Sequence, residues 1–381
     1  PPRSTLFPYT TLFRSNIFKA IRWIFAILII LFSIATLMNY SYGQTICLLL
    51  IAALLVYWPD DIERKFNKSV SVSFRILSII LVIAVKQVVF KSEPKTSIYK
   101  SEGYKHEIWT IYDSCMNDWP IDTKQFYIIT KYGKVNVLEC GNPDKPPLVM
   151  FHAASMGAHS WAENLKPIVE SYHIFSFDNP GEGNKSELKD ALVFPSTPKE
   201  VADLYKYLLD ELDIDSAVVF GASNGGFIAQ NLAYYYPEKV TKMALFGPMG
   251  LTQLTNGSIA MMGLCTMYPF QFLRDAVADW ALGKAPVSHE KYGDWFNSIM
   301  KGTIPSIAQP VPMTTEQKNS MNTPVLLFLG SEDKIVGNAQ IAKKTAEDYP
   351  NIQVEILKSG HLIAVEHSEF VNKAIAIFLN I

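Results

Sequence analysis

Gly221-Ala222-Ser223-Asn224-Gly225 is the stretch from which the architecture of this chain can be worked out, because it forms a G-x-S-x-G pattern. The apolar run at residues 217–220 precedes the pattern and reads as a strand, and residues 227–233 follow it with a helical pattern. A serine on such a sharp strand-to-helix turn holds its hydroxyl out of the sheet. Glycines are expected beside it because the turn leaves no room for a Cβ atom. The first amides of the following helix then point toward the serine.

The pattern by itself is common, since only three of its five positions are fixed. An ordinary turn that happens to contain a serine is the alternative interpretation. The strand before the pattern, the helix after it and the partner residues found further along the chain favour a catalytic Ser223. Gly221 and Gly225 are then structural residues of the same site.

Size, charge and cysteine usage set limits on the class of protein. The chain has 381 residues, which predicts a core domain with an additional segment, and its formal net charge is −2. A nucleic-acid-binding surface would need clustered Lys and Arg, so we expect no nucleic-acid partner. The cysteines show neither a C-x-x-C pair nor zinc-ligand spacing, and we interpret them as small buried side chains: Cys47, Cys115, Cys140 and Cys265.

The N-terminal quarter has an unusual composition. Residues 1–15 resemble a translated sequencing-adapter read, so we expect them to be non-native and exclude them from the fold. Apolar runs follow at residues 23–38, 45–58 and 70–90, although Arg75 and Lys86 interrupt the third. A membrane-spanning helix needs ~20 mostly apolar residues. We therefore expect a transmembrane region of two to three helices at residues 16–90, in preference to buried core helices or a cleaved signal peptide.

The basic residues around these runs indicate an orientation. They place the N-terminus and the loop at residues 60–69 in the cytoplasm. A third span would put the remaining chain outside, whereas Lys91, Lys95 and Lys100 favour the inside. The length of the third run leads us to predict a multi-pass membrane protein with its following domain on the extracytoplasmic side. The lipid bilayer is then an expected partner.

The rest of the chain alternates between strand-like and helix-like segments. Residues 91–125 read as a linker with a short helix at 107–119, and a catalytic domain is expected at residues 126–381. Two antiparallel-looking strands followed by strand–helix alternation predict an α/β fold with a mostly parallel, eight-stranded sheet and helices on both faces. The interval at about 249–320 breaks this rhythm and is rich in Met, Trp and Tyr. We expect it to form an inserted helical cap over the carboxyl ends of the strands.

A serine hydroxyl needs a base, and the base needs an orienting carboxylate. In this type of sheet their order along the chain is serine, acid, histidine. The strand at 324–330 leads to Asp333, which we predict as the acid, with Glu332 as the alternative. The next strand, at 352–357, leads to His361, which we predict as the general base. The other candidate in this region, His367, lies at the start of the last helix and reads as a surface or capping residue.

An oxyanion hole requires two backbone N–H groups directed at one oxygen. Asn224 follows the nucleophile and should supply the first N–H group. The second should come from the loop after the strand at 148–152, where we predict Ala154 and keep Ala153 as the alternative. We interpret His152 as a structural residue that braces this loop.

These motifs resemble the α/β-hydrolase superfamily, on its carboxylesterase-like branch, from about residue 112 to the end of the chain. Five stretches carry the resemblance, and their occurrence in the order found in the family is far more specific than any one of them alone. They are FHAASMGAHSW at 151–161, DNPGEGNKS at 178–186, GASNGG at 221–226, GSEDKIV at 330–336 and SGHLIAVEHSEF at 359–370. The resemblance implies Ser223, Asp333 and His361 as the catalytic triad. The chain departs from the family where Ala153 replaces a frequent glycine and where His367 replaces a frequent proline.

A serine nucleophile excludes the members of this superfamily that attack with aspartate. We expect a serine hydrolase that cleaves carboxylic esters through an acyl-enzyme and needs neither a metal nor a cofactor. The alternatives are a C–C bond hydrolase, a thioesterase, an acyltransferase or a non-catalytic binding protein. Trp280, Trp295 and Phe296 indicate either an apolar pocket for a lipophilic acyl group or the cap's own core.

Overall fold

The computed structural model describes residues 96–117, 119–253, 258, 271–283 and 285–381. The chain divides into two units, Pro1–Glu93 and Pro94–Ile381, and everything described below belongs to the second unit.

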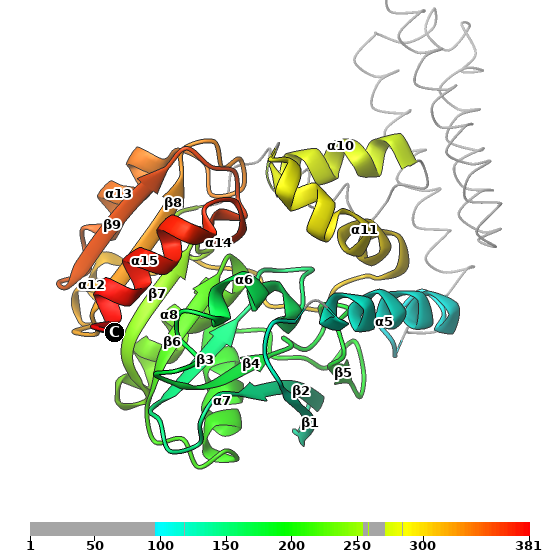
Figure 1. Cartoon of the computed structure of the whole chain (residues 1–381), viewed down its shortest axis with the longest axis horizontal. Helices are drawn as coiled ribbons and strands as arrows, with labels where there is room; N and C mark the ends of the chain where they lie inside the picture. Colours follow the sequence, from blue (N-terminus) through cyan, green and yellow to red (C-terminus); the bar gives the residue numbers. More distant parts are fainter. Residues whose placement is uncertain (1–95, 118, 254–257, 259–270, 284) are drawn as a thin grey trace, which may run out of the picture. The chain divides into compact units, whose positions relative to one another are not determined.

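A single mixed β-sheet organises this unit (Figure 1). Its main path runs β1-β2-β4-β3-β6-β7-β8-β9, and the two-residue β5 pairs with β2 beside that path. The pairs that involve β2 are antiparallel, whereas every pair from β4 to β9 is parallel. The strands are β1 (Lys124–Ile129), β2 (Gly133–Cys140), β3 (Pro147–Phe151), β4 (His173–Phe177), β5 (Glu187–Leu188), β6 (Ala217–Ala222), β7 (Val240–Phe246), β8 (Val325–Gly330) and β9 (Ile352–Leu357).

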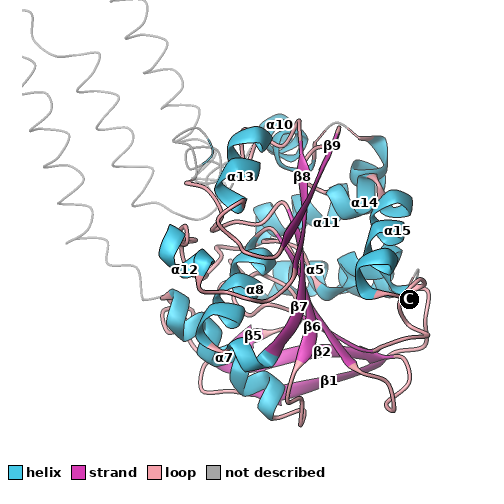
Figure 2. Ribbon diagram, turned by 90° about the vertical axis from the view of Figure 1, so that its left-hand side faces the viewer, coloured by secondary structure: helices cyan, strands magenta, loops and turns pink. Residues whose placement is uncertain are grey.

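Helices cover both faces of the sheet, with α7, α8, α12 and α13 on one side and α14 and α15 on the other (Figure 2). Their bounds are α5 (Glu102–Asn117), α6 (Ala162–Leu165), α7 (Pro198–Asp210), α8 (Asn224–Tyr235), α10 (Gln271–Leu282), α11 (Pro286–Gly302), α12 (Thr315–Asn319), α13 (Ala339–Ala346), α14 (Ile363–Glu366) and α15 (Ser368–Leu379). Among the described residues there are also two 3₁₀ turns, at Ala158–Trp161 and Pro237–Lys239.

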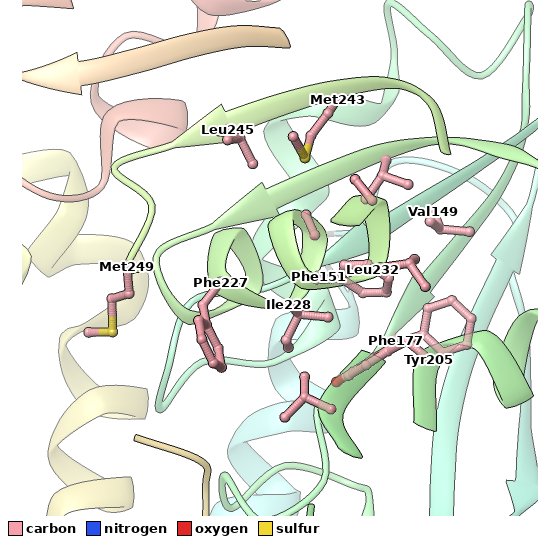
Figure 3. Packing of buried hydrophobic residues seen from close by; sticks show 14 of the residues in the cluster. Val149, Phe151, Phe177, Tyr205, Phe227, Ile228, Leu232, Met243, Leu245 and Met249 are labelled. Carbon is pink, nitrogen blue, oxygen red and sulfur yellow. The ribbon is translucent and has the colours of Figure 1, made fainter. Parts of the chain in front are cut away.

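The sheet separates two apolar cores, because successive side chains of a strand point to opposite faces. In β3, Val149 and Phe151 join the core beneath α7 and α8 (Figure 3). Leu148 and Met150 join the other core, together with residues of α6 and α15. Burial on both faces explains why the central strands read as continuous apolar runs in the sequence.

The predicted strands agree with the structure to within two residues. After β3 the chain forms a 3₁₀ turn followed by α6, which ends at Leu165. Pro167 lacks the N–H group needed to extend that helix. The helix expected at 107–119 is α5, which begins earlier, at Glu102. The interval expected to be inserted runs between β7 and β8 and contains α10 and α11.

The segment ahead of β1 is integrated into this unit. α5 packs against α11, and Ile108 and Tyr112 of α5 are completely buried. Tyr99 forms an antiparallel bridge with Thr303, just after α11. Hydrogen bonds from Lys100 N to Gly302 O and from Ile304 N to Ile98 O, both 2.8 Å, flank the bridge.

The predicted membrane localisation requires a correction. Across the described ranges, no helix has both the length and the apolar character needed to cross a bilayer. The three apolar runs at residues 23–38, 45–58 and 70–90, and with them the region predicted at 16–90, lie outside the described residues. We therefore assign neither a multi-pass topology nor an extracytoplasmic side, and the bilayer is withdrawn as a partner.

Candidate active site

Ser223 occupies the turn between β6 and α8 in a strained conformation, with φ 50° and ψ −113°. Its N–H group donates to Phe246 O at 2.9 Å, which fixes the turn against β7. Close backbone contacts, within the turn for Gly221 and with the end of β3 for Gly225, explain both flanking glycines. A Cβ at residue 221 would lie 2.5 Å from Gly225 O, and a Cβ at residue 225 would lie 1.9 Å from Phe151 O.

His361 and Asp333 form a buried pair at the ends of neighbouring strands. His361 Nδ1 lies 2.7 Å from Asp333 Oδ2. The other carboxylate oxygen, Oδ1, accepts hydrogen bonds from the backbone amides of Ile335 and Val336 at 2.8 and 3.1 Å. Burial opposes ionisation of Asp333, but His361 and the two amides outweigh it and lower the pKa of this carboxyl. The carboxylate is therefore charged and held in a fixed orientation.

The second ring nitrogen of His361 is not occupied by the Asp333 pair. Nε2 is buried and has no hydrogen-bond partner among the described residues. Ser223 and His361 line one small cavity of about 30 Å³, and only 2% of Ser223 and 8% of His361 are exposed. A buried imidazole nitrogen without a partner can accept a proton from a group that comes within hydrogen-bond reach.

The alternatives left open by the sequence differ in their placement. Glu332 is exposed, whereas Asp333 is buried against His361. His367 is half-buried just ahead of α15, and its Nε2 lies 3.0 Å from Lys358 O. The histidine and the acid that the structure brings together are thus His361 and Asp333.

His152 braces the loop that follows β3. Its Nδ1 lies 2.7 Å from Ala153 O, which can only accept a hydrogen bond, so Nδ1 carries the proton. Its Nε2 then accepts a hydrogen bond from Asn179 N at 2.8 Å. Burial lowers the pKa of His152 to about 4, so the ring is neutral near neutral pH.

The two oxyanion candidates of this loop are placed differently. Ala153 lines the cavity that holds Ser223, and Ala154 is not among the residues that line it. Gly225 N donates to His152 O at 3.1 Å, which joins this loop directly to the serine turn. The assignment of Asn224 and Ala154 as donors of the oxyanion hole stays a prediction.

Apolar side chains form most of the remaining cavity wall, chiefly Met156, Trp161, Phe246, Ile363 and Val365. The cap aromatics named from the sequence lie elsewhere. Trp295 and Phe296 are buried within core clusters, and Trp280 lines a separate, more polar cavity beside His361. Their role as the acyl pocket is not supported by this placement, and Trp295 and Phe296 instead form part of the core.

Two residues of the site were not predicted from the sequence. Gly247 follows β7 and lies against the His361–Asp333 pair. Glu182 is 1% exposed and contacts both Asn224 and Ser155. Their positions in the sequence could have indicated them, since each residue follows a strand closely. Glu182 also stands between two glycines in the stretch at 178–186.

Comparison with known proteins agrees with this geometry. Residues 146–262 match a family model described as alpha/beta hydrolase fold. A relative named "Uncharacterized carboxylesterase nap", from Bacillus subtilis (strain 168), is 26% identical over 285 residues, which cover 71% of this chain and 91% of its own length. A relative from Burkholderia cepacia, named 2-hydroxy-6-oxo-6-phenylhexa-2,4-dienoate hydrolase, is 27% identical over 283 residues, with 68% and 96% covered.

Among solved structures, carboxylesterase CesB (YbfK) from Bacillus subtilis aligns with a TM-score of 0.67 and 23% identity. The alignment covers 73% of this chain and 98% of that protein. The predicted α/β-hydrolase fold is thus confirmed, and carboxylesterases are among the homologues of the chain.

Proposed function

We propose that this chain, which has the α/β-hydrolase fold and carboxylesterases among its homologues, cleaves carboxylic esters through an acyl-serine intermediate. The observation that carries the proposal is the shared cavity of Ser223 and His361. The serine stands there on a strained turn, and His361 presents an unpartnered Nε2 while Asp333 occupies its Nδ1. This arrangement suits a hydroxyl nucleophile that loses its proton as it attacks.

In the first step Ser223 Oγ attacks the ester carbonyl carbon and its proton passes to His361 Nε2. The ring then carries a positive charge, which the Asp333 carboxylate at 2.7 Å stabilises without taking the proton. Collapse of the tetrahedral intermediate breaks the bond to the alcohol oxygen, and His361 returns the proton to that oxygen.

The tetrahedral intermediate carries a negative oxygen that needs two N–H donors. We assign these to Asn224 and Ala154, with Ala153 as the alternative. Asn224 begins α8, so its amide also lies at the positive end of the helix dipole. A water molecule then attacks the acyl-serine and gives a proton to His361, which passes it to Ser223 Oγ as the bond to the acyl carbon breaks and the acid leaves.

The cavity beside Ser223 favours a small apolar acyl group. Its wall is mostly apolar, and its volume is only about 30 Å³. A longer acyl chain would require side chains to move. We therefore propose short-chain esters as the preferred substrates, within the apolar class expected from the sequence.

Hydrolysis of p-nitrophenyl esters from acetate to octanoate tests the proposal. Wild type should be active with the short esters, and Ser223→Ala should lose about 10⁴-fold or more in kcat. Ser160→Ala is the matched control, because Ser160 lines the same cavity but its hydroxyl donates to Gly157 O at 2.8 Å. A fluorophosphonate should label wild type at Ser223, and an adduct on another residue would contradict the assignment.

The Burkholderia cepacia relative makes a C–C bond hydrolase the second candidate, because its name describes hydrolysis of a dienoate. Both reactions use the same Ser223, His361 and oxyanion donors, so the fold does not separate them. Activity toward a vinylogous 1,5-diketone with none toward esters would favour this candidate. Equal inactivity of wild type and Ser223→Ala toward esters, thioesters and amides would favour a binding protein.

A further inference from the structure

Glu182 lies in the loop after β4, and its carboxyl group joins two segments that the proposed reaction depends on. Oε1 accepts a hydrogen bond from Asn224 Nδ2 at 2.7 Å. Oε2 accepts one from the backbone N–H of Ser155 at 3.0 Å. Asn224 directly follows the serine, and Ser155 belongs to the loop after β3. One side chain therefore bridges the two sides of the expected oxyanion hole.

The loop after β3 needs such support because its backbone is strained. Ser155 has φ 61°, a left-handed conformation that non-glycine residues rarely adopt. Its N–H group is held by Glu182, and its carbonyl accepts a hydrogen bond from Trp295 Nε1 at 2.9 Å. Strain of this kind persists only where the surrounding contacts fix the conformation.

We infer, on the basis of the proposed function, that Glu182 is a positioning residue that fixes the loop after β3 and the start of α8 so that their amides meet at one oxyanion. The residue touches no reacting atom. It acts through Asn224 and Ser155, whose backbone positions set where the donor N–H groups point. A displacement of either segment would weaken binding of the transition state more than binding of the ester.

The groups that surround the carboxyl group of Glu182 determine whether it is charged. The titratable groups that face it are Asp178 on its own loop, His152 after β3 and Tyr205 on α7. His152 is neutral and supplies no positive charge, and burial raises the pKa of Tyr205, so this phenol adds no negative charge. Glu182 also lines a small cavity together with Asn224, Val201 and Leu204.

Burial in this setting raises the pKa of Glu182 to about 8, although the hydrogen bonds from Asn224 and Ser155 oppose the shift. The side chain is therefore mostly neutral near pH 7. A neutral acid bonded to Asn224 does not repel the negative charge that develops at the oxyanion. An ionised one would repel it, because charges in a buried site are poorly screened.

Glu182→Gln is the principal test, because glutamine keeps the shape but places an NH2 group, which cannot accept a hydrogen bond, against one of the two N–H donors. We expect about a 10-fold lower kcat with KM changed less than about threefold, since the donors act mainly in the transition state. Wild type should also lose kcat/KM above about pH 8, and the variant should not lose it in that range. Glu139→Gln is the matched control, since Glu139 pairs with Lys124 and His173 away from the site.

Asn224→Ala removes the hydrogen bond to Glu182 Oε1 from the other side while the backbone N–H group remains. It should lower kcat by a similar factor, and the double variant should lose less than the product of the two single losses, because both changes disrupt one bridge. This second variant keeps the test valid if Glu182→Gln fails to fold. Additive losses, a loss confined to KM, or an unchanged alkaline fall in Glu182→Gln would each overturn the inference.

The rate at which a fluorophosphonate labels Ser223 separates this inference from the proposed ester substrate. Phosphonylation needs the nucleophile and the oxyanion donors but not an ester. If wild type is labelled at Ser223 but hydrolyses no ester, the ester proposal fails, and a slower labelling rate in Glu182→Gln still supports the positioning role. If Glu182→Gln is labelled as fast as wild type, the positioning role fails and ester hydrolysis stands.

Discussion

Gly247 lies directly against Asp333: a Cβ atom at residue 247 would come within 3.1 Å of Asp333 Oδ2 and 3.4 Å of His361 Nδ1. Gly247 also has φ +49°, a backbone conformation that L side chains rarely adopt. The end of β7 therefore leaves just enough room for the His361–Asp333 pair.

Gly247→Ala should lower both stability and activity. We expect a loss of about 1–2 kcal/mol in the free energy of unfolding, from the left-handed backbone, and a fall in kcat as the pair is displaced. Urea unfolding and ester hydrolysis measure the two effects. Gly293→Ala in α11 is the control, since a Cβ there would meet nothing within 4 Å and should leave both unchanged or slightly increase stability. Full activity of Gly247→Ala would contradict the close approach.

Asp333→Asn should lower kcat by about 10³–10⁴-fold with a much smaller change in KM, because an amide cannot stabilise the charged His361 ring. Glu332→Gln alters the neighbouring exposed carboxyl and should retain activity. Steady-state kinetics on a short ester separate the two variants. The opposite result would assign the acid to Glu332.

Met156→Ala should change the preferred acyl length. Met156 is 2% exposed and lines the cavity beside Ser223, so a smaller side chain there enlarges a space of about 30 Å³. Butyrate should gain relative to acetate by about 10-fold or more in kcat/KM, the effect typical of one or two methylene groups.

The control for this change is Met321→Ala, which removes a buried methionine that does not line the cavity. It should lose stability without changing the ratio between the two esters. Identical ester ratios in Met156→Ala and wild type would show that the acyl group lies elsewhere.

Glu182 should also give the stability of the protein a specific pH dependence. Its pKa rises from 4.5 to about 8 on folding, so the folded state keeps a proton that the unfolded state releases between these values. The stabilisation is complete below about pH 4.5 and is lost as the pH rises through 8, at no more than about 1.4 kcal/mol per pH unit.

Urea unfolding of wild type and Glu182→Gln between pH 5 and 9 measures this difference, which should shrink as the pH rises. Glu139→Gln provides a control whose difference from wild type should stay constant over this range, because Glu139 titrates below it. Burial raises the pKa of Glu139, but hydrogen bonds from Lys124 and His173 outweigh it and lower the pKa overall, so its contribution is lost as the pH falls. Parallel curves for wild type and Glu182→Gln would contradict the buried neutral acid.

The sequence predicted the features that depend on local pattern. Ser223, Asp333 and His361 each follow an apolar strand closely, and parallel strands bring their carboxyl ends to one edge of a sheet. The strand-to-helix turn at Ser223 was equally readable, because steric crowding in a tight turn requires glycines at fixed positions. The fold and the candidate pair of His361 and Asp333 therefore needed no long-range information.

Contacts between positions far apart in the chain could not be predicted from the sequence. Glu182 acts on residues 27 and 42 positions away in the chain, and nothing in its local sequence specifies those partners. The aromatic residues of the cap were equally ambiguous, since a buried Trp295 and a pocket-lining tryptophan look alike in a sequence. The membrane prediction rested on hydropathy alone, and the described helices gave it no support.

The pairing of the segment ahead of β1 with α11 has a consequence for motion. The bridge from Tyr99 to Thr303 and the burial of Tyr112 beside Trp295 tie α5 and α11 together. Trp295 in turn holds Ser155 of the loop after β3. α11 therefore cannot move independently of α5: to admit a bulky substrate, it must move together with α5 or break these contacts. A chain shortened to begin at β1 would lack this restraint on α11.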